Sequence, residues 1–253
     1  MSSNERIGAE LAESFRVTHE LGTGPLGDLF TLSEETVGVD VMSMDAGESE
    51  HGLTAWDPAT GRAVIAVATT PHPMRQRSSI AHELGHVLQG IDAPTAFPGE
   101  RSPQEIQADS FARHLLLPRA ELRNIGRSPS LAQFSEIVRT FGLSPQMAAI
   151  QLRTARVLPE EELERYAQWS TRRLAIEFGW FSEYRSLAAQ SRTPRTPRRL
   201  MARVMQAYHQ GLLNAEEAAR WYATTPEDLR SQLDGGDPPL EPDDLGIGRP
   251  LFG

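Results

Sequence analysis

Residues 80–88 of the chain read Ile80-Ala81-His82-Glu83-Leu84-Gly85-His86-Val87-Leu88. Residues four apart on an α-helix lie on one face, so His82 and His86 can direct two imidazoles at one ion. Glu83 projects beside that face, where its carboxylate can reach a water on the ion. A zinc ion with three protein ligands keeps such a water and lowers its pKa to about 7. The carboxylate then takes the proton as the water attacks a polarised carbonyl. The pattern predicts a zinc-dependent hydrolase with Glu83 as general base.

The His-Glu-x-x-His pattern is rare enough to be informative. The chain has 7 His and 23 Glu among 253 residues, so random order supplies roughly 0.02 matches. The segment from Met74 to Gly90 also has helical periodicity, with Ile80, Leu84 and Val87 on its apolar face and Gly90 as a stop. A structural pair of histidines is the alternative interpretation.

A third ligand must come from His, Asp or Glu, because the chain has no cysteine. The next predicted helix offers Glu105, with Asp109 one turn later on the same side. A ligating His usually donates its other N–H to a carboxylate, and Asp109 suits that role. The alternative interpretation is that Glu105 and Asp109 belong to an ordinary solvent-exposed acidic helix face, which would have the same spacing. Asp92, Glu100, Asp109 itself and His114 are the competing ligands, although loop residues are less rigidly aimed.

The remaining pattern predicts an α+β fold, in which a small antiparallel or mixed sheet and helices carry the His-Glu-x-x-His segment and an all-helical C-terminal region follows. Before the motif, we expect helices over 10–20 and 26–35 and strands over 37–44, 52–56 and 62–69. After it, we expect helices over 103–117, 131–141, 145–158 and 160–189, and two or three short helices over 200–233.

The domain organisation follows from these elements and from composition. The only apolar groups in 191–199 are two proline rings, which cannot build a core and so indicate a linker. The Gly, Pro and Asp content after residue 235 is typical of a disordered tail. We therefore expect a metallopeptidase domain with a helical N-terminal segment over 1–158, a helical extension over 159–190, the linker over 191–199, a small helical region over 200–234 and the tail over 235–253.

Charge and hydropathy indicate the protein's location and the kinds of partner it can bind. The formal net charge is −9 and the pI about 5.3, which argues against direct nucleic-acid binding because that needs clustered cations. The N-terminal residues lack the apolar core of a signal peptide, and no segment has the apolar length of a membrane span. These features predict a cytoplasmic protein without membrane association.

Two blocks together resemble the ImmA/IrrE family of zinc metallopeptidases. The first is the segment 80–88. The second reads Glu105-Ile106-Gln107-Ala108-Asp109-Ser110-Phe111-Ala112-Arg113-His114-Leu115-Leu116-Leu117-Pro118, which is similar to the family's Glu, two residues, Ala, a polar residue, Phe-Ala and a Leu-Leu-x-Pro ending. The segment 138–152 also resembles the family's next helical pair, which is similar to a helix-turn-helix. The resemblance covers roughly residues 35 to 158, and His-Glu-x-x-His alone indicates only a zincin.

The resemblance implies a minimal zincin-like domain with Glu105 as the third zinc ligand beside His82 and His86. It also implies narrow proteolysis, in which a zinc-dependent endopeptidase cleaves a specific protein, typically a helix-turn-helix transcriptional repressor. Manganese is the alternative metal. Nothing in the residue spacing identifies that substrate, and the Arg-Pro linker with the helices after it is a departure that can change the target.

Two other hypotheses remain open from the sequence. The chain can be a regulatory protein-binding module, or a pseudopeptidase, with a structural metal site and helix-turn-helix-like docking helices. It can also be a peptidase that stays silent until a partner engages it. Peptide hydrolysis also needs a hydrogen-bond donor that stabilises the negative oxygen (the oxyanion) formed when water attacks the carbonyl. Tyr184, Tyr208 and His209 have suitable chemistry, but the sequence does not choose among them.

Overall fold

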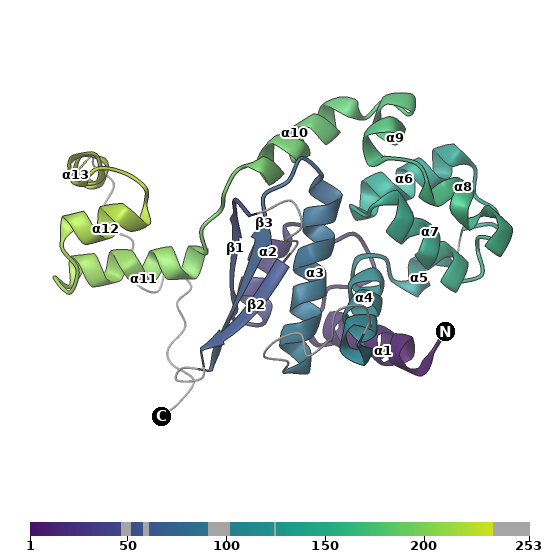
Figure 1. Cartoon of the computed structure of the whole chain (residues 1–253), viewed down its shortest axis with the longest axis horizontal. Coiled ribbons are helices and arrows are strands. Elements are labelled where there is room, and N and C mark those ends of the chain that lie inside the picture. Colours follow the sequence, from purple (N-terminus) through teal and green to yellow (C-terminus); the bar gives the residue numbers. More distant parts are fainter. Residues whose placement is uncertain (47–51, 58–60, 91–101, 124, 235–253) are drawn as a thin grey trace. The chain divides into compact units, whose positions relative to one another are not determined.

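The computed structural model describes residues 1–46, 52–57, 61–90, 102–123 and 125–234. The chain divides into two compact units, Met1–Arg195 and Thr196–Gly253 (Figure 1). The predicted disordered tail over 235–253, and the loop that contains Asp92 and Glu100, lie outside the described residues. None of the described helices has the length and apolar character needed to cross a membrane.

Two helices precede the sheet. Helix α1, Ser3–Thr18, begins well before the predicted residue 10, because Ser2 and Glu5 form a capping box that satisfies the first backbone N–H groups. Helix α2, Leu29–Thr36, also starts at its N-cap, Asp28, whose side chain accepts from Phe30 and Thr31. Capping therefore decides both starts, where apolar periodicity alone was misleading.

The sheet has three strands, β1 Asp40–Met44, β2 Gly52–Asp57 and β3 Arg62–Ala68, in the order β1-β3-β2. β1 is parallel to β3 and β2 is antiparallel to it, so the predicted small sheet is mixed and the α+β class is confirmed. Along β3, the side chains of Ala63, Ile65 and Val67 are buried and alternate with less buried neighbours. This alternation gives the sheet one core face.

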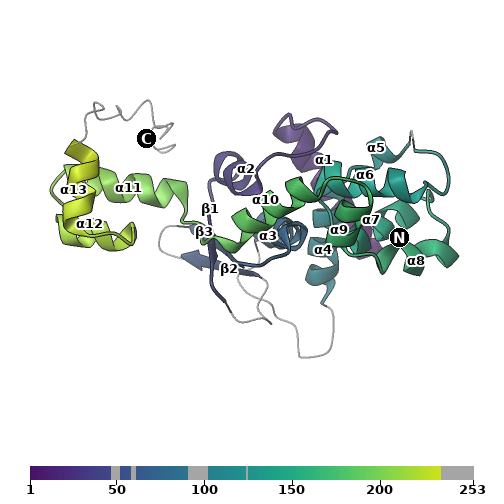
Figure 2. The same ribbon diagram turned by 90° about the horizontal axis from the view of Figure 1, so that it is seen from above.

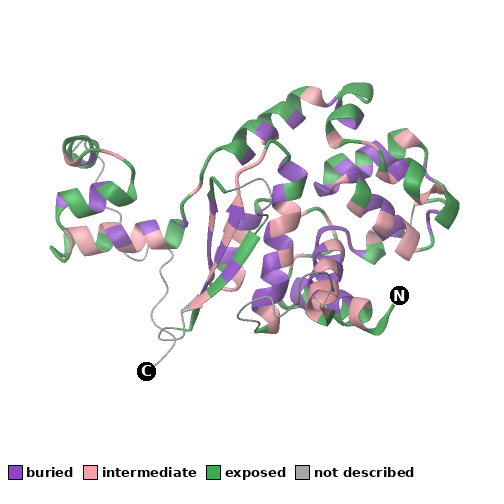
Figure 3. Ribbon diagram, in the orientation of Figure 1, coloured by how far each residue is buried: buried purple, intermediate pink, exposed green. Residues whose placement is uncertain are grey.

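Helix α3, Pro73–Gln89, packs against that sheet and against α4, Pro103–Leu116, while α4 packs on α1 (Figures 1 and 2). Gly90 ends α3 in the left-handed conformation, with φ 69°, as predicted. Ser102 caps α4 and Pro103 occupies its first turn. Figure 3 shows buried residues along α3 and β3. These residues belong to the core against which α3 and α4 pack.

Gly8 lets α1 approach α4 closely. A Cβ at residue 8 would lie 2.2 Å from the carbonyl oxygen of Gln107 and 2.9 Å from the backbone nitrogen of Phe111. Two polar contacts lie along the same seam: Ser110 Oγ donates to the carbonyl of Glu5, and Gln107 Nε2 donates to Asn4 Oδ1. Helix α1 is therefore a fixed support for α4.

The rest of the first unit is helical. Its elements are α5 Arg119–Leu122, α6 Leu131–Phe141, α7 Pro145–Thr154, the 3₁₀ turn η1 Glu160–Glu162, α8 Leu163–Ala167, α9 Thr171–Glu177 and α10 Phe181–Arg192. The bounds of α6 agree with the prediction. Helix α7 ends at Thr154 rather than at residue 158, since Arg156 adopts a left-handed conformation with φ 61°. The predicted helical extension over 160–189 is broken into η1, α8, α9 and α10.

The chain after α10 pairs with the sheet edge. The backbone N–H of Ser43 in β1 donates to the carbonyl of Arg195 at 2.8 Å, and the N–H of Arg195 donates back to Ser43 at 3.0 Å. Ser191 holds the same segment through hydrogen bonds with Thr70. The boundary between the compact units falls after Arg195, inside the predicted linker, and the other predicted domain boundaries stay predictions.

The second unit, as far as it is described, contains three helices: α11 Arg198–His209, α12 Ala215–Trp221 and α13 Pro226–Asp234. Val204, Ala218, Ala219 and Leu229 form its small buried cluster. Asn214 and Glu217 form a capping box at the start of α12.

Candidate metal centre

The site begins with the close approach of α3 and α4. A Cβ on Gly85 would lie 3.2 Å from the Cα of Ala108 and 3.1 Å from the ring of Phe111. The small residues at 85 and 108 thus allow the two helices to pack with little space between them. The helix face that carries the two motif histidines meets the face of α4 that carries Glu105 and Asp109.

Three side chains converge at this seam. The Nε2 atoms of His82 and His86 lie 3.0 Å apart. Each is also 3.2 Å from a carboxylate oxygen of Glu105: Oε2 for His82 and Oε1 for His86. Among the described residues, these three form the group of His, Asp or Glu side chains whose ligand atoms are close enough together to hold one metal ion.

Asp109 lies behind His82. Its Oδ1 is 3.0 Å from Nδ1 of His82, so in the neutral ring the proton is on Nδ1 and the lone pair of Nε2 is available to a cation. In the charged ring Nδ1 donates to Asp109 and Nε2 donates to Glu105. Burial disfavours the charged imidazole, but hydrogen bonds to Asp109 and Glu105 outweigh it and raise the pKa of His82 to about 9. Hydrogen bonds from His82 and His86 hold the pKa of Glu105 well below its usual value.

The Glu83 side chain lies against strand β2. Glu83 is 9% exposed, and its Oε2 accepts a hydrogen bond from Thr54 Oγ1 at 2.8 Å. Sequence reasoning did not single out Thr54. Strand periodicity could indicate that Thr54 faces inward, but not which side chain of α3 it meets.

The structure separates the competing ligands. His114 is 2% exposed and lies in the core, where its Nδ1 accepts from Gln151 Nε2 at 3.1 Å, and it is not part of the convergent group. Asp92 and Glu100 lie outside the described residues. Tyr184, considered for the oxyanion, donates its hydroxyl to the carbonyl of Pro71 at 3.3 Å. Tyr208 and His209 belong to the second unit.

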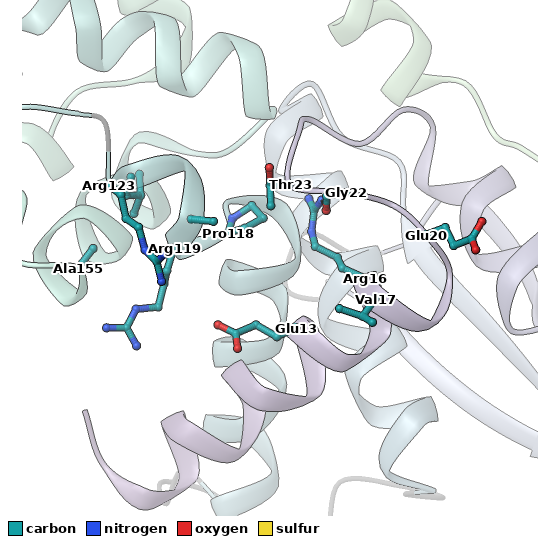
Figure 4. Close-up of a pocket in the computed structure, with 12 residues that line it drawn as sticks. Glu13, Arg16, Val17, Glu20, Gly22, Thr23, Pro118, Arg119, Arg123 and Ala155 are labelled. Atoms are coloured by element: carbon teal, nitrogen blue, oxygen red, sulfur yellow. The ribbon is translucent and has the colours of Figure 1, made fainter.

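A cleft of about 810 Å³ adjoins the site. It includes Asp109 and continues past Ser78 on α3 to Trp169 and Tyr184, which come from the later helices. A different cleft, of about 860 Å³, lies between the C-terminal part of α1 and α5 (Figure 4). Its lining residues include Glu13 and Arg16, and none of the convergent triad lines it.

The donor set and its spacing fit a small divalent cation. Bonds of about 2.0–2.1 Å in a tetrahedral site separate neighbouring ligand atoms by about 3.3 Å, and the observed separations are 3.0–3.2 Å. Two imidazoles and one carboxylate, without sulfur, are a ligand set that zinc accepts with its fourth position open. The arrangement is therefore suited to hydrolysis at a metal-activated water.

Comparison with known proteins agrees with this chemistry. No curated protein matches the chain. The family model of the IrrE N-terminal-like domain, Peptidase_M78, matches residues 34–153. The matched segment includes β1 to β3, α3, α4 and every residue of the convergent triad. Residues 34–153 therefore form a peptidase domain of the ImmA/IrrE type.

Proposed function

We propose that the chain is a zinc-dependent endopeptidase that cleaves one specific protein, a helix-turn-helix transcriptional repressor. His82, His86 and Glu105 would hold the zinc, Glu83 would act as general base, and Asp109 would orient His82. The proposal retains the cytoplasmic location expected from the sequence.

One observation carries the metal assignment. The two Nε2 atoms and the carboxylate oxygens of Glu105 lie at mutual distances of 3.0–3.2 Å. Without a cation, these three contacts cannot all be hydrogen bonds, because an N–H shared between the two Nε2 atoms leaves the lone pair of one nitrogen facing the carboxylate. With a cation, all three side chains direct lone pairs at one centre, and Asp109 fixes the tautomer of His82.

The chain's own groups divide the work of hydrolysis. When bound, zinc supplies a Lewis acid that polarises a carbonyl and lowers the pKa of water. The Glu83 carboxylate accepts the proton that the attacking water gives up, and it can return that proton to the leaving amine. The cleft lined by Asp109 gives room for a segment of substrate on the Asp109 side of His82.

The metal assignment is tested by elemental analysis of purified protein. Wild type should contain about one zinc per chain, and Glu105→Ala should lose most of it because two protein ligands bind zinc much more weakly than three. Glu136→Ala is the matched control, since this glutamate is on an exposed helix face with its side chain 63% exposed. Manganese in the wild type would change the metal but not the ligands, whereas full zinc in Glu105→Ala would refute the ligand set.

The general base is tested by cleavage. We expect Glu83→Gln to keep zinc and to lose cleavage of the helix-turn-helix repressor that we propose as substrate, because an amide cannot accept the proton. The assay follows the fragments by mass spectrometry. Undiminished cleavage by Glu83→Gln would refute the mechanism, and zinc-loaded wild type that leaves the repressor intact would refute the substrate assignment.

A further inference from the structure

We infer that Thr54, with Gly52, is a positioning residue for the Glu83 carboxylate. The inference rests on the proposed function, because it assigns the inner face of edge strand β2 the task of holding the general base. Thr54 acts through Glu83, because both acceptors near its hydroxyl belong to that residue.

The first support is a buried hydrogen bond. Thr54 is 7% exposed, and its hydroxyl donates to Glu83 Oε2 at 2.8 Å. The backbone carbonyl of Glu83 is a second, more distant acceptor at 3.4 Å, but a hydroxyl has one proton and the shorter, charged acceptor takes it. The bond therefore fixes one oxygen of the carboxylate.

The second support is the absence of a side chain at residue 52. A Cβ on Gly52 would lie 2.7 Å from Glu83 Oε1 and 2.9 Å from its Cγ. Real Cβ atoms essentially never come that close, so any larger residue would displace the glutamate. Residues 52 and 54 lie on the same face of a strand, and together they form a seat for the carboxylate: bare backbone beside one oxygen and a hydroxyl on the other.

The seat matters because Glu has three rotatable side-chain bonds, and a general base is effective only when its oxygen is held near the proton it takes. Helix α3 packs against β2 as well as against β3, so the inner face of β2 places this seat against the helix that carries Glu83. The same strand therefore links sheet geometry to the orientation of the base.

The decisive test measures binding of acetohydroxamate to the zinc-loaded full-length protein. This small compound chelates zinc and shares a proton with a carboxylate beside the ion, so its affinity reports the orientation of Glu83 without any substrate. Thr54→Val removes the hydroxyl and keeps the branched shape. We expect it to weaken binding about tenfold, as expected for loss of a hydrogen bond to a charged group, and we expect Thr54→Ser to restore most of the affinity.

A double-mutant cycle separates positioning from general damage. In a Glu83→Ala background, Thr54→Val should have no further effect on acetohydroxamate binding, and zinc affinity should be the same in all variants. Gly52→Ala should weaken binding at least as much as Thr54→Val. Leu53→Ala is the control, because Leu53 lies on the opposite face of β2 and is 58% exposed.

The outcomes distinguish a failure of the proposed role of Glu83 from a failure of the positioning role of Thr54. If Glu83→Ala binds acetohydroxamate as tightly as wild type does, the proposed role of Glu83 is wrong. If Glu83→Ala weakens binding and Thr54→Val does not, only the positioning role is wrong. An equal loss from Thr54→Val with and without Glu83 would also overturn it. With the repressor as substrate, Thr54→Val should lower kcat and leave KM unchanged.

Discussion

Gly85 of α3 lies against Ala108 of α4, at a separation where an added Cβ would be 3.2 Å from the Cα of Ala108. This contact is one turn or less from each residue of the metal triad. It sets how near Glu105 comes to the two histidines, since the carboxylate is carried by α4 and the imidazoles by α3.

A bulky residue at 85 should push the helices apart. We expect Gly85→Val to lower the free energy of unfolding by about 1–3 kcal/mol, as overpacking does, and to weaken zinc binding as Glu105 withdraws. Denaturant unfolding and a chelator competition assay measure the two effects. Ser79→Val, also on α3, is the control for a β-branched residue in the helix. Wild-type zinc affinity in Gly85→Val would show that the spacing of the helices is not critical.

Loss of the Asp109 carboxylate should weaken the metal site without removing a ligand. The 3.0 Å contact with His82 Nδ1 fixes the ring's tautomer, and loss of such a partner typically costs 10–100-fold in metal affinity. We expect Asp109→Ala to show a decrease of about that size in a titration against a zinc chelator. Asp109→Asn should lie between Asp109→Ala and wild type, because its amide oxygen still accepts the bond. Equal affinity in all three proteins would contradict the role.

The buried His114 should make stability fall in mild acid. Burial, with the nearby charges of Arg113 and Arg119, lowers the pKa of His114 to about 4 from 6.5. Between these values the unfolded chain binds a proton that the folded chain does not. The free energy of unfolding should therefore decrease as the pH falls from 6.5 to 4, by at most about 3 kcal/mol from this group.

The measurement is denaturant unfolding at several values of pH, for wild type and for His114→Asn. Asparagine can still accept from Gln151 but does not titrate. We expect this variant to be less stable at pH 7 and to have a shallower decrease in stability between pH 6.5 and 4. Parallel pH profiles for the two proteins would mean that His114 is not the group responsible.

Arg16 should be an important support for the C-terminal end of α4. It is 5% exposed, and its guanidinium donates to the carbonyl of Leu115 from Nε at 2.8 Å and to that of Gly22 from Nη1 at 2.7 Å. Burial lowers the pKa of Arg16 to about 10, so it remains charged at neutral pH. Figure 4 shows it in the wall of the cleft beside α5.

We expect Arg16→Met to destabilise the fold by about 2–3 kcal/mol, because it leaves buried carbonyls without donors. Arg16→Lys should be intermediate, since an ammonium cannot reproduce the planar fork. Thermal unfolding gives the comparison, with the exposed Arg6→Met on the same helix as control. A change in Arg16→Met no larger than in Arg6→Met would show that the network contributes little.

Local sequence determined the elements that depend on short-range physics. The bounds of α6, the stop of α3 at Gly90 and the cap of α4 at Ser102 were predictable, because a serine side chain caps a helix start and a left-handed glycine ends a helix within a few residues of sequence. The pairing of His82 with His86 on one face follows from helical periodicity in the same way. The early start of α1 was missed, although the Ser2 and Glu5 capping box is readable in the sequence.

The tertiary structure decided the side-chain contacts between elements that are far apart in the sequence. From its spacing alone, Glu105 could equally be a metal ligand or part of a solvent-exposed acidic helix face. The close packing of α3 on α4 brings its carboxylate within 3.2 Å of both histidines. The contact of Thr54 with Glu83 joins residues 29 apart in the chain, and that of His114 with Gln151 joins residues 37 apart. Such contacts depend on register and interhelical distance, which are set by the whole core and leave no periodic trace in the sequence.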